Sequence, residues 1–416
     1  MQRVKLLFLI SMGAILEYYD FAIFLYLAPL IGKSLIPVAN VTMNLILSYA
    51  ILGVGAVCRP LGGLVFAHIG DTLGRSKTFV YTVLFMGIPT LGIAFIPNVG
   101  LIGVWATIIL IGLRVFQGFA IGGEIPGSIV FGYEIAAGRR KALSSAVVVM
   151  GTNVGFVCAS IVCTILLKMT YLGHFANWRI AFILGGCFGI GSYFLRKKIV
   201  ETPEFQEYKN TLSHERVPLA MLLQSHRTPV LQILGLSSFL ASSLAVFTFY
   251  MPNYLAQFYH LPLHTLMEFN SYTIVIFIVG ALIAGIYDKY FAKTFFLYFI
   301  PAFCVAALIL FNLYPVLSLA QILTLHVLML LLLGLLCGRL PVLCATFFPV
   351  SVRYTGVALS YNISFGIVAG LSQVILTWLI AVTGILAMPA IYVSVFGCFA
   401  LWALTSMDNQ QLIDYR

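Results

Sequence analysis

Twelve apolar stretches, each long enough to cross a lipid bilayer, fill most of the chain and are separated by short polar segments. A membrane-spanning helix needs about 20 predominantly apolar residues, whereas the strands of a membrane barrel show short segments of alternating polarity. The long continuous runs therefore predict an all-α integral membrane protein with twelve transmembrane helices. The predicted spans cover residues 5–31, 43–67, 78–97, 101–126, 143–168, 178–196, 228–256, 265–286, 294–312, 316–347, 357–381 and 387–406.

The longest polar stretch, residues 196–227, divides this pattern into two sets of six spans. Short sequence words recur with a shift of about 216 residues: 67–71 matches 284–288, and 142–144 matches 358–360. A parallel repeat of six plus six helices is typical of transporters that hold their substrate near the bilayer midplane. We therefore predict two pseudo-symmetric six-helix bundles, 1–197 and 228–416, joined by a cytoplasmic linker at 198–227. The linker is expected to form short amphipathic surface helices or, alternatively, only a solvated tether.

Composition agrees with a membrane protein, because 61% of the 416 residues are hydrophobic and only 9% are charged. The net charge of +10 does not indicate nucleic-acid binding, since the basic residues gather on one side of the twelve-span arrangement. Those residues are Arg3, Lys5, Arg75, Lys77, Arg139, Arg140, Lys141, Arg196, Lys197, Lys198, Lys289, Lys293 and Arg353. By the positive-inside rule, both termini are expected to be cytoplasmic, with the lipid bilayer as the surrounding partner.

Sites for metals, nucleotides or covalent catalysis are not expected. The eight cysteines are scattered through apolar runs without metal-ligand spacing. No glycine-rich turn ending in Lys and Ser or Thr is present to bind ATP, and no combination of nucleophile and base stands out. The sequence therefore predicts neither an enzyme nor a cofactor, and transport energy must come from an ion gradient or from the solute itself.

Seven motifs resemble the major facilitator superfamily, and more closely its metabolite:proton symporter branch, which includes proline/betaine, α-ketoglutarate, citrate and shikimate transporters. They are Gly70–Lys77, Leu16–Phe21, Arg59–Gly63, Arg114 with Gln117-Gly118 and Gly122–Glu124, Glu201–Phe205, Phe348-Pro349 and Val352–Gly356. Three positions depart from the family pattern. Thr72 replaces a base, Ala67 replaces Gly, and Thr346 replaces a Glu before Phe-Pro, which predicts a looser or differently balanced network in the cytoplasmic loops.

The fourth predicted span carries a polar stripe. Arg114, Gln117, Ile121 and Glu124 follow helical spacing and so share one face. A cation and an acid on one face could bind an anionic solute and hold a proton, and a guanidinium presents a fork that suits a carboxylate. The alternative is a buried ion pair that only fixes helix packing.

Two acids, Glu17 and Asp20, lie three residues apart in the first predicted helix. Two neighbouring carboxylates at low dielectric tend to share a proton, because like charge and desolvation both oppose the second ionisation. We therefore expect Asp20, Glu17 and Glu124 to be the proton-coupling candidates, with Asp20 preferred for its greater depth. The alternative is that one acid pairs with Arg59 or Arg114.

Polar and aromatic residues in other spans complete the predicted solute site. In the seventh span, Phe247, Tyr250 and Tyr254 share a face beside Pro252 and Asn253, either to pack or to orient a polar solute. In the eleventh span, Asn362 and Gln373 are eleven residues apart and could face one cavity. The expected solute-binding residues are Arg114, Gln117, Arg59, Tyr19, Tyr250, Tyr254, Asn253, Tyr361, Asn362 and Gln373.

Charged residues at the inner helix ends predict a cytoplasmic gate. The resemblance assigns Asp71, Gly74 and Arg75 to a latch that closes the cytoplasmic side while the site faces outward, and a carboxylate there can pair with Arg139, Arg140 or Arg353. The alternative is a turn that only sets topology. The full expected gate set is Asp71, Gly74, Arg75, Asp288, Glu134, Arg139 and Arg353.

Together, the pattern and the resemblance predict a monomeric, proton-coupled symporter that imports a small carboxylate-bearing organic solute across the bacterial inner membrane by alternating access. A proton-driven exporter or antiporter of siderophores or drugs would share the same fold. A channel or a sensor without transport activity is disfavoured by the paired halves and by the lack of a large signalling domain.

Overall fold

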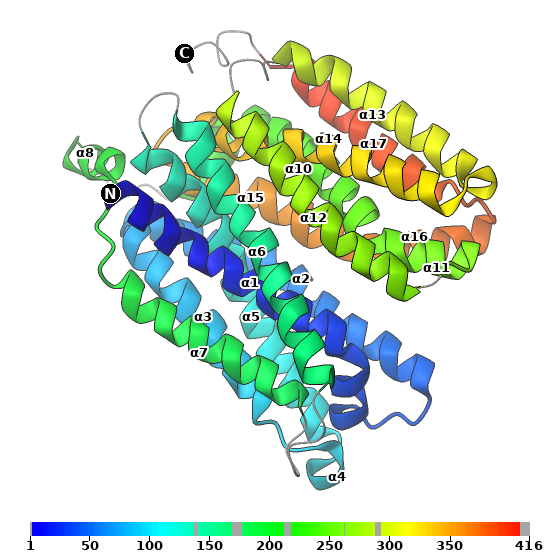
Figure 1. Cartoon of the computed structure of the whole chain (residues 1–416). Coiled ribbons are helices and arrows are strands. Elements are labelled where there is room, and N and C mark those ends of the chain that lie inside the picture. Colours follow the sequence, from blue (N-terminus) through cyan, green and yellow to red (C-terminus); the bar gives the residue numbers. More distant parts are fainter. Residues whose placement is uncertain are drawn as a thin grey trace. The chain divides into compact units, whose positions relative to one another are not determined.

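The computed structural model describes residues 2–136, 140–168, 177–211, 218–261, 263–287 and 293–407, and it is helical with no strand in those ranges (Figure 1). Twelve helices in them are long and apolar enough to cross a membrane. The predicted all-α, twelve-helix architecture is therefore confirmed. Arg139 and Asp288, which belong to the expected gate, lie outside the described residues, as does the side chain of Asn253.

The first half of the chain forms α1 (Gln2–Leu35), α2 (Val41–Thr72), α3 (Arg75–Ala94), α4 (Val99–Ile102), α5 (Trp105–Ile135), α6 (Arg140–Lys168) and α7 (Trp178–Arg196). Two short helices follow, α8 (Pro203–Thr211) and α9 (Pro218–Ser225). The short length of α8 and α9 agrees with the amphipathic surface helices expected between the halves.

The second half forms α10 (Arg227–Leu244), η1 (Ala245–Tyr250), α11 (Met251–Tyr259), α12 (Leu263–Ile286), α13 (Lys293–Leu313), η3 (Tyr314–Val316), α14 (Leu319–Thr346), α15 (Arg353–Asn362), η4 (Ile363–Ala369), α16 (Gly370–Thr383) and α17 (Met388–Thr405). The chain groups into two compact units, one of Met1–Ile135 with Val147–Leu219 and one of Ala136–Ala146 with Ala220–Arg416. Most of the linker therefore belongs to the first unit.

Glycines allow one helix pair in the first unit to pack backbone against backbone. A Cβ on Gly118 of α5 would lie 2.0 Å from the Gly55 carbonyl oxygen of α2, and one on Gly122 would lie 2.1 Å from that of Arg59. Lipid chains are as apolar as the side chains of membrane helices, so the hydrophobic effect does not drive such helices together. Small residues favour association instead, because they let two backbones approach closely and make extensive van der Waals contact. These glycines thus position α5, which carries the polar stripe, directly against α2.

The same arrangement recurs in the second unit between α12 and α14. A Cβ on Gly334 would lie 2.3 Å from the Phe277 carbonyl oxygen, and one on Gly338 would lie 2.2 Å from that of Ala281. Gly334 and Gly338 stand 216 positions after Gly118 and Gly122. The shift of the sequence repeat is therefore also the shift of a packing contact.

The seventh and eleventh spans each contain a π-helical turn, η1 and η4. Such wide turns are rare and often mark functional positions in α-helices. Pro252 follows η1 directly in the second position of α11. A proline has no backbone N–H, so a carbonyl group one turn earlier in the helix loses its hydrogen-bond partner. A local π-helical turn is one way in which a membrane helix supplies that carbonyl with another partner.

Candidate functional site

Asp20 lies at the centre of a polar cluster inside the first unit. Its carboxylate, from α1, accepts hydrogen bonds from Arg114 Nη1 at 2.7 Å and Gln117 Nε2 at 3.0 Å, both on α5. Thr90 Oγ1 of α3 donates a third bond at 3.0 Å. Because Asp20 is only 2% exposed, the acid and the arginine form a buried, charge-assisted pair.

Arg114 keeps unused hydrogen-bonding capacity in this cluster. Its Nε and Nη2 atoms are buried without a hydrogen-bond partner among the described residues, as is Oε1 of Gln117. The guanidinium carbon lies 3.9 Å from the centre of the Phe24 ring and 5.8 Å from that of Phe182. One edge of the guanidinium is thus neutralised by Asp20, while the remaining donors have no bond in a largely apolar setting.

Glu17 has an arginine of its own. Arg59 Nη2, from α2, lies 3.2 Å from Glu17 Oε1, and neither carboxylate oxygen of Glu17 accepts a hydrogen bond from a described residue. The two acids of α1 therefore use different partners on different helices and do not hydrogen-bond to each other. The structure does not favour the predicted sharing of one proton between Glu17 and Asp20, because each carboxylate is compensated separately.

Glu124 also lies apart from the Asp20 cluster. Arg196, the last residue of α7, reaches its carboxylate at 2.9 Å, and Thr82 Oγ1 donates a bond at 2.6 Å. The same guanidinium donates to the carbonyl oxygens of Leu9, Ile10 and Phe79 at 3.1, 2.7 and 3.1 Å. The single stripe predicted on α5 therefore divides into two polar sites, and the one at Glu124 matches the alternative of an ion pair that fixes packing.

Arg196 was not among the predicted site residues, since the sequence only marks it as one of several bases at the end of the sixth span. Gly13 makes room for the pair, because a Cβ there would lie 1.7 Å from Glu124 Oε1. The side chains of both Arg196 and Glu124 are fully buried. A pair with these exact partners on α1, α3 and α5 becomes visible only when the helices are placed together.

Three predicted solute-binding tyrosines use their hydroxyls within their own unit. Tyr19 donates to the Ala181 carbonyl oxygen of α7 at 2.9 Å, and Tyr254 donates to the Leu386 carbonyl oxygen at 2.8 Å. The hydroxyl of Tyr250 accepts a bond from Thr377 at 3.4 Å. Packing is therefore the better supported reading for Tyr19 and Tyr254, whose hydroxyls satisfy backbone carbonyls.

The eleventh span does not keep the simple helical spacing that the sequence prediction assumed. Tyr361 stacks on Phe365 with ring centres 4.2 Å apart, and Asn362 is fully buried. Gln373 is half-buried and follows the π-helical turn η4, which separates it from Asn362. Because a π-turn changes the rotation per residue, a separation of eleven residues does not place these two side chains on one face as it would in a regular α-helix.

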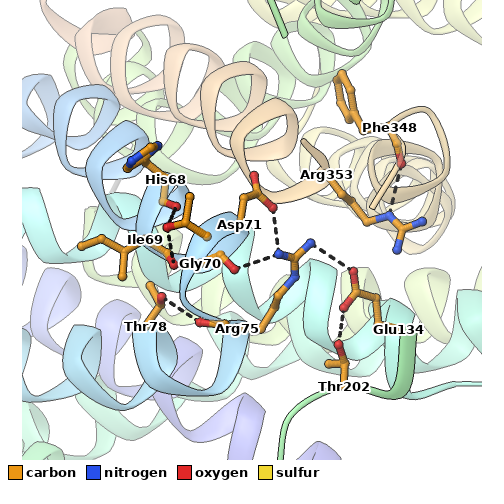
Figure 2. A network of polar contacts seen from close by, with 12 residues as sticks. His68, Ile69, Gly70, Asp71, Arg75, Thr78, Glu134, Thr202, Phe348 and Arg353 are labelled. Atoms are coloured by element: carbon orange, nitrogen blue, oxygen red, sulfur yellow. Dashed lines mark hydrogen bonds and ion pairs between the residues drawn. The ribbon is translucent and has the colours of Figure 1, made fainter. Parts of the chain in front are cut away.

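A second polar cluster, the α2–α3 cluster, consists of Asp71, Arg75, Glu134 and Thr202 (Figure 2). Arg75 Nη1 lies 2.9 Å from Asp71, and Nη2 lies 3.5 Å from Glu134. Thr202 Oγ1 donates to Glu134 at 2.6 Å, and Arg75 also donates to the Gly70 carbonyl oxygen at 2.8 Å. The structure thus joins three predicted gate residues, Asp71, Arg75 and Glu134, around one buried guanidinium, with Arg75 as an observed partner of Asp71.

The motif Glu201–Phe205 closes over this cluster, which the sequence did not predict. Glu201 Oε2 accepts bonds from the backbone N–H and the hydroxyl of Ser76 at 3.1 and 3.0 Å, so it caps the first turn of α3. The Phe205 ring centre lies 4.3 Å from the Arg75 guanidinium carbon. Gly74 is required at the turn, because its φ is +125° and a Cβ would lie 2.4 Å from Glu201.

The remaining described gate residue, Arg353, binds the end of α14 in the second unit. Its Nε donates to the carbonyl oxygen of Ala345 at 3.1 Å and to that of Phe348 at 3.2 Å, the latter drawn in Figure 2. The two threonines that depart from the family pattern bond to their own helices, Thr72 to the His68 carbonyl oxygen and Thr346 to that of Val342, both at 2.8 Å. Their hydroxyls therefore stabilise helix ends, a role different from that of a charged side chain.

Residues 10–373 match the family model of the Major Facilitator Superfamily. The chain belongs to this superfamily. The predicted family is thereby confirmed, and the chain is a multi-pass membrane transporter rather than an enzyme.

Curated relatives extend over nearly the whole chain. It is 29% identical over 419 residues to the proline/betaine transporter of Salmonella typhimurium (strain LT2). The alignment covers 96% of this chain and 82% of that protein. It is also 29% identical over 416 residues to the proline/betaine transporter of Escherichia coli (strain K12), with 94% and 80% covered.

Among solved structures, the proton:xylose symporter XylE bound to 6-bromo-6-deoxy-D-glucose is similar in fold. The TM-score is 0.80 at 12% sequence identity, with 97% of this chain and 94% of that chain covered. At this identity the likeness concerns the fold alone, and it agrees with the twelve-helix architecture.

Proposed function

We propose that this protein is a proton-coupled symporter that imports a small carboxylate-bearing zwitterion, of the proline or betaine type, across the bacterial inner membrane by alternating access. The names of the relatives support the solute class, and the observation that carries the proposal is the buried Asp20–Arg114 pair. An acid that can hold a proton contacts a cation that can hold a carboxylate.

Coupling follows from competition for the guanidinium. While Asp20 is ionised, it neutralises Arg114 and weakens the attraction between Arg114 and a second carboxylate. When Asp20 takes up a proton, its charge no longer opposes solute binding, and Arg114 can present its charge and its unused donors to the solute. Proton and solute therefore bind together more favourably than either binds alone, which is the thermodynamic requirement for symport.

Gln117 and Thr90 position this pair by holding Asp20 Oδ1 while Arg114 binds Oδ2. Glu17 with Arg59 forms a second acid–base pair that could take part in coupling, whereas the four further bonds of the Glu124–Arg196 pair favour a structural role. In the second unit we propose that Tyr250, Tyr361, Asn362 and Gln373 contribute to the body of the solute site.

The α2–α3 cluster is proposed as the cytoplasmic latch. Its three charged side chains, Asp71, Arg75 and Glu134, are buried at the end of α2 that the distribution of basic residues places inside. Buried charged groups are costly to leave unpaired, so the three side chains can separate only when water reaches them. A cluster of this kind is suited to stabilise the one of two conformations in which it is intact.

Reconstituted protein would test the proposal through the variant Asp20→Asn. We expect the variant to lose accumulation of labelled solute driven by an inward proton gradient but to retain exchange of solute across the membrane, because exchange needs no net protonation cycle. Glu124→Gln is the matched control and should keep gradient-driven accumulation in the folded fraction. Accumulation by Asp20→Asn against the solute gradient would reject Asp20 as the proton carrier.

The direction of coupling separates import from the exporter or antiporter that shares this fold. A symporter accumulates solute in vesicles when the proton gradient points inward, and dissipating that gradient stops accumulation. An antiporter instead accumulates solute when the gradient points outward. Measuring both gradient directions with the same vesicles therefore decides between the two mechanisms.

A further inference from the structure

Among the described groups that bond to Asp20, the hydroxyl of Thr90 differs from the other two because it can both donate and accept. Arg114 Nη1 and Gln117 Nε2 carry hydrogens and no available lone pair, so they can only donate. Thr90 Oγ1 lies 3.0 Å from Asp20 Oδ1, and a hydroxyl has one donor and two acceptor sites. If Asp20 takes up a proton, the bond to Thr90 is therefore the one of these three that can reverse.

Thr90 has a second acceptor for its own hydrogen. Its Oγ1 lies 2.9 Å from the Met86 carbonyl oxygen, one turn earlier in α3. One hydrogen cannot form both bonds, so it points either to Asp20 or to Met86. Gln117 Nε2 donates to Thr90 Oγ1 at 2.7 Å, which uses one lone pair and leaves the other for Asp20.

The heavy atoms of Thr90 are held in place by their surroundings. The side chain is fully buried, and a Cβ on Gly185 of α7 would lie 3.2 Å from its methyl carbon Cγ2. A threonine in a helix has few side-chain rotamers, and a bond to a carbonyl oxygen one turn earlier favours the one observed. Reversal of the bond to Asp20 therefore requires only that the hydroxyl hydrogen turns about the C–O bond.

We propose that Thr90 is a positioning residue for the transported proton, donating to Asp20 when the acid is ionised and accepting from it when the acid is protonated. In the protonated state the hydrogen on Asp20 Oδ1 points to Thr90 Oγ1, and the Thr90 hydrogen turns to the Met86 carbonyl oxygen without leaving Thr90. Each hydrogen then has an acceptor in both charge states, whereas a buried O–H without one is costly. The inference rests on the proposed function, since it takes Asp20 to be the proton carrier.

The other ionisable groups near Asp20 on the helices of the first unit have contacts of their own, and none of them is hydrogen-bonded to Asp20 among the described residues. Glu17 of α1 pairs with Arg59 of α2, and Tyr19 donates to a carbonyl oxygen of α7. The charged residues of α3 lie in its first turn. The remaining groups on α5, α6 and α7 are Glu124, Cys158, Cys163, Arg179 and Arg196.

The pH dependence of proline binding tests the role of Thr90. The affinity of the purified chain for proline is measured by calorimetry over a range of pH. In the wild type we expect affinity to fall as pH rises, because ionised Asp20 neutralises Arg114. Thr90→Val keeps the shape of the side chain but removes the hydroxyl, so protonated Asp20 loses its acceptor while ionised Asp20 keeps two of its three bonds. The fall in affinity should therefore move to lower pH by about one unit, which is a tenfold change in proton concentration.

Three further variants control this measurement. Thr90→Ser retains the hydroxyl and should keep the wild-type profile, whereas Thr90→Ala should reproduce the profile of Thr90→Val. Thr78→Val, on the same helix, removes an equally buried hydroxyl that bonds to the Gly74 carbonyl oxygen. It should leave the pH profile in place, because Thr78 has no contact with Asp20.

Three results would overturn the role of Thr90 alone. A move to higher pH in Thr90→Val would mean that Thr90 only donates to the ionised acid, and an unchanged profile would mean that another group accepts the proton. A Thr90→Ser profile equal to that of Thr90→Val would mean that the hydroxyl is not the group that matters. Asp20→Asn tests the proposed function itself, since its affinity should not depend on pH. A pH dependence that persists in Asp20→Asn, or that is missing from the wild type, would refute Asp20 as the proton carrier.

Discussion

At the scale of single residues, the first unit stabilises its buried acids by pairing each with an arginine. Asp20 pairs with Arg114, Glu17 with Arg59, and Glu124 with Arg196. The pairs differ in how completely they are bonded, since Arg114 keeps two atoms without a hydrogen bond while Arg196 binds three carbonyl oxygens besides its acid. We infer that the less completely bonded pair, Asp20 with Arg114, serves binding and that the more extensively bonded pair, Glu124 with Arg196, serves structure.

Arg114→Ala should weaken solute binding at least tenfold while the protein stays folded. Loss of a buried charged hydrogen bond costs about 2–5 kcal/mol, which exceeds the value for a tenfold change. Calorimetric titration of purified protein measures the effect. Arg179→Ala is the control, because Arg179 is also a buried arginine and bonds to the Ala94 carbonyl oxygen, at the end of α3, and to Asn98 beyond it. Unchanged affinity in folded Arg114→Ala would remove this residue from the solute site.

Glu124→Gln should lower thermal stability more than it lowers coupling. Removing one partner of a buried ion pair costs about 3–5 kcal/mol, because the other charge is left uncompensated. Thr82→Val, which removes only one hydrogen bond to the same carboxylate, should cost about 1 kcal/mol. Melting curves in detergent would show the two shifts. A variant as stable as the wild type but uncoupled would instead assign the proton to Glu124.

At the scale of secondary structure elements, the two units use one device to pack their most extensive helix pairs. Gly118 and Gly122 bring α5 against α2, and Gly334 and Gly338 bring α14 against α12. Polar side chains are attached to these same helices, on α5 in the first unit and on α14 in the second. Close backbone packing therefore also sets where these polar side chains point.

Gly118→Ala and Gly334→Ala should each destabilise the protein by about 1–3 kcal/mol, the usual cost of inserting a methyl group where no space exists. The new Cβ atoms would lie 2.0 and 2.3 Å from backbone oxygens, which cannot move as a side chain can. Gly112→Ala on α5 is the control, because nothing lies within 4 Å of its Cβ position. Equal melting temperatures for Gly118→Ala and Gly112→Ala would contradict the role of Gly118 in the contact between α2 and α5.

At the scale of the whole molecule, the described buried acids belong to the first unit, and the linker is fastened to that unit as well. Arg196 ties the end of α7 to α1, and the Glu201–Phe205 motif then holds Ser76, Glu134 and Arg75. We infer that the start of the linker moves with the first unit during transport. We also infer that the stability of the proposed latch depends on the position of the Glu201–Phe205 motif, which contacts Arg75 and Glu134.

Asp71→Asn should shift the conformational population toward forms that are open to the cytoplasm. The shift cannot exceed the lost interaction, about 1–3 kcal/mol. Maleimide labelling from the cytoplasmic side, at a cysteine engineered into a background without the eight native cysteines, reports the population. Lys77→Ala, at an exposed residue in the first turn of α3, is the control. Equal labelling rates for the three proteins would reduce the loop to a turn that sets topology.

Sequence alone determined the number of helices, their approximate spans and the superfamily, because apolar length and short motifs are local properties of the chain. It also singled out Asp20, Arg114 and Gln117, since charge within an apolar run is costly and marks a site. Helical spacing placed Glu124 on the same stripe, however, and could not indicate that Arg196 would reach it from another helix.

Only the tertiary structure decided which partner each polar group has. Glu17 and Asp20 are three residues apart, yet Arg59 and Arg114 approach them from two different helices. The π-helical turn η4 changed the face predicted for the eleventh span, and Glu201 proved to cap a helix 125 positions away in sequence. Partners of this kind depend on helix packing, which places residues together that no local pattern connects.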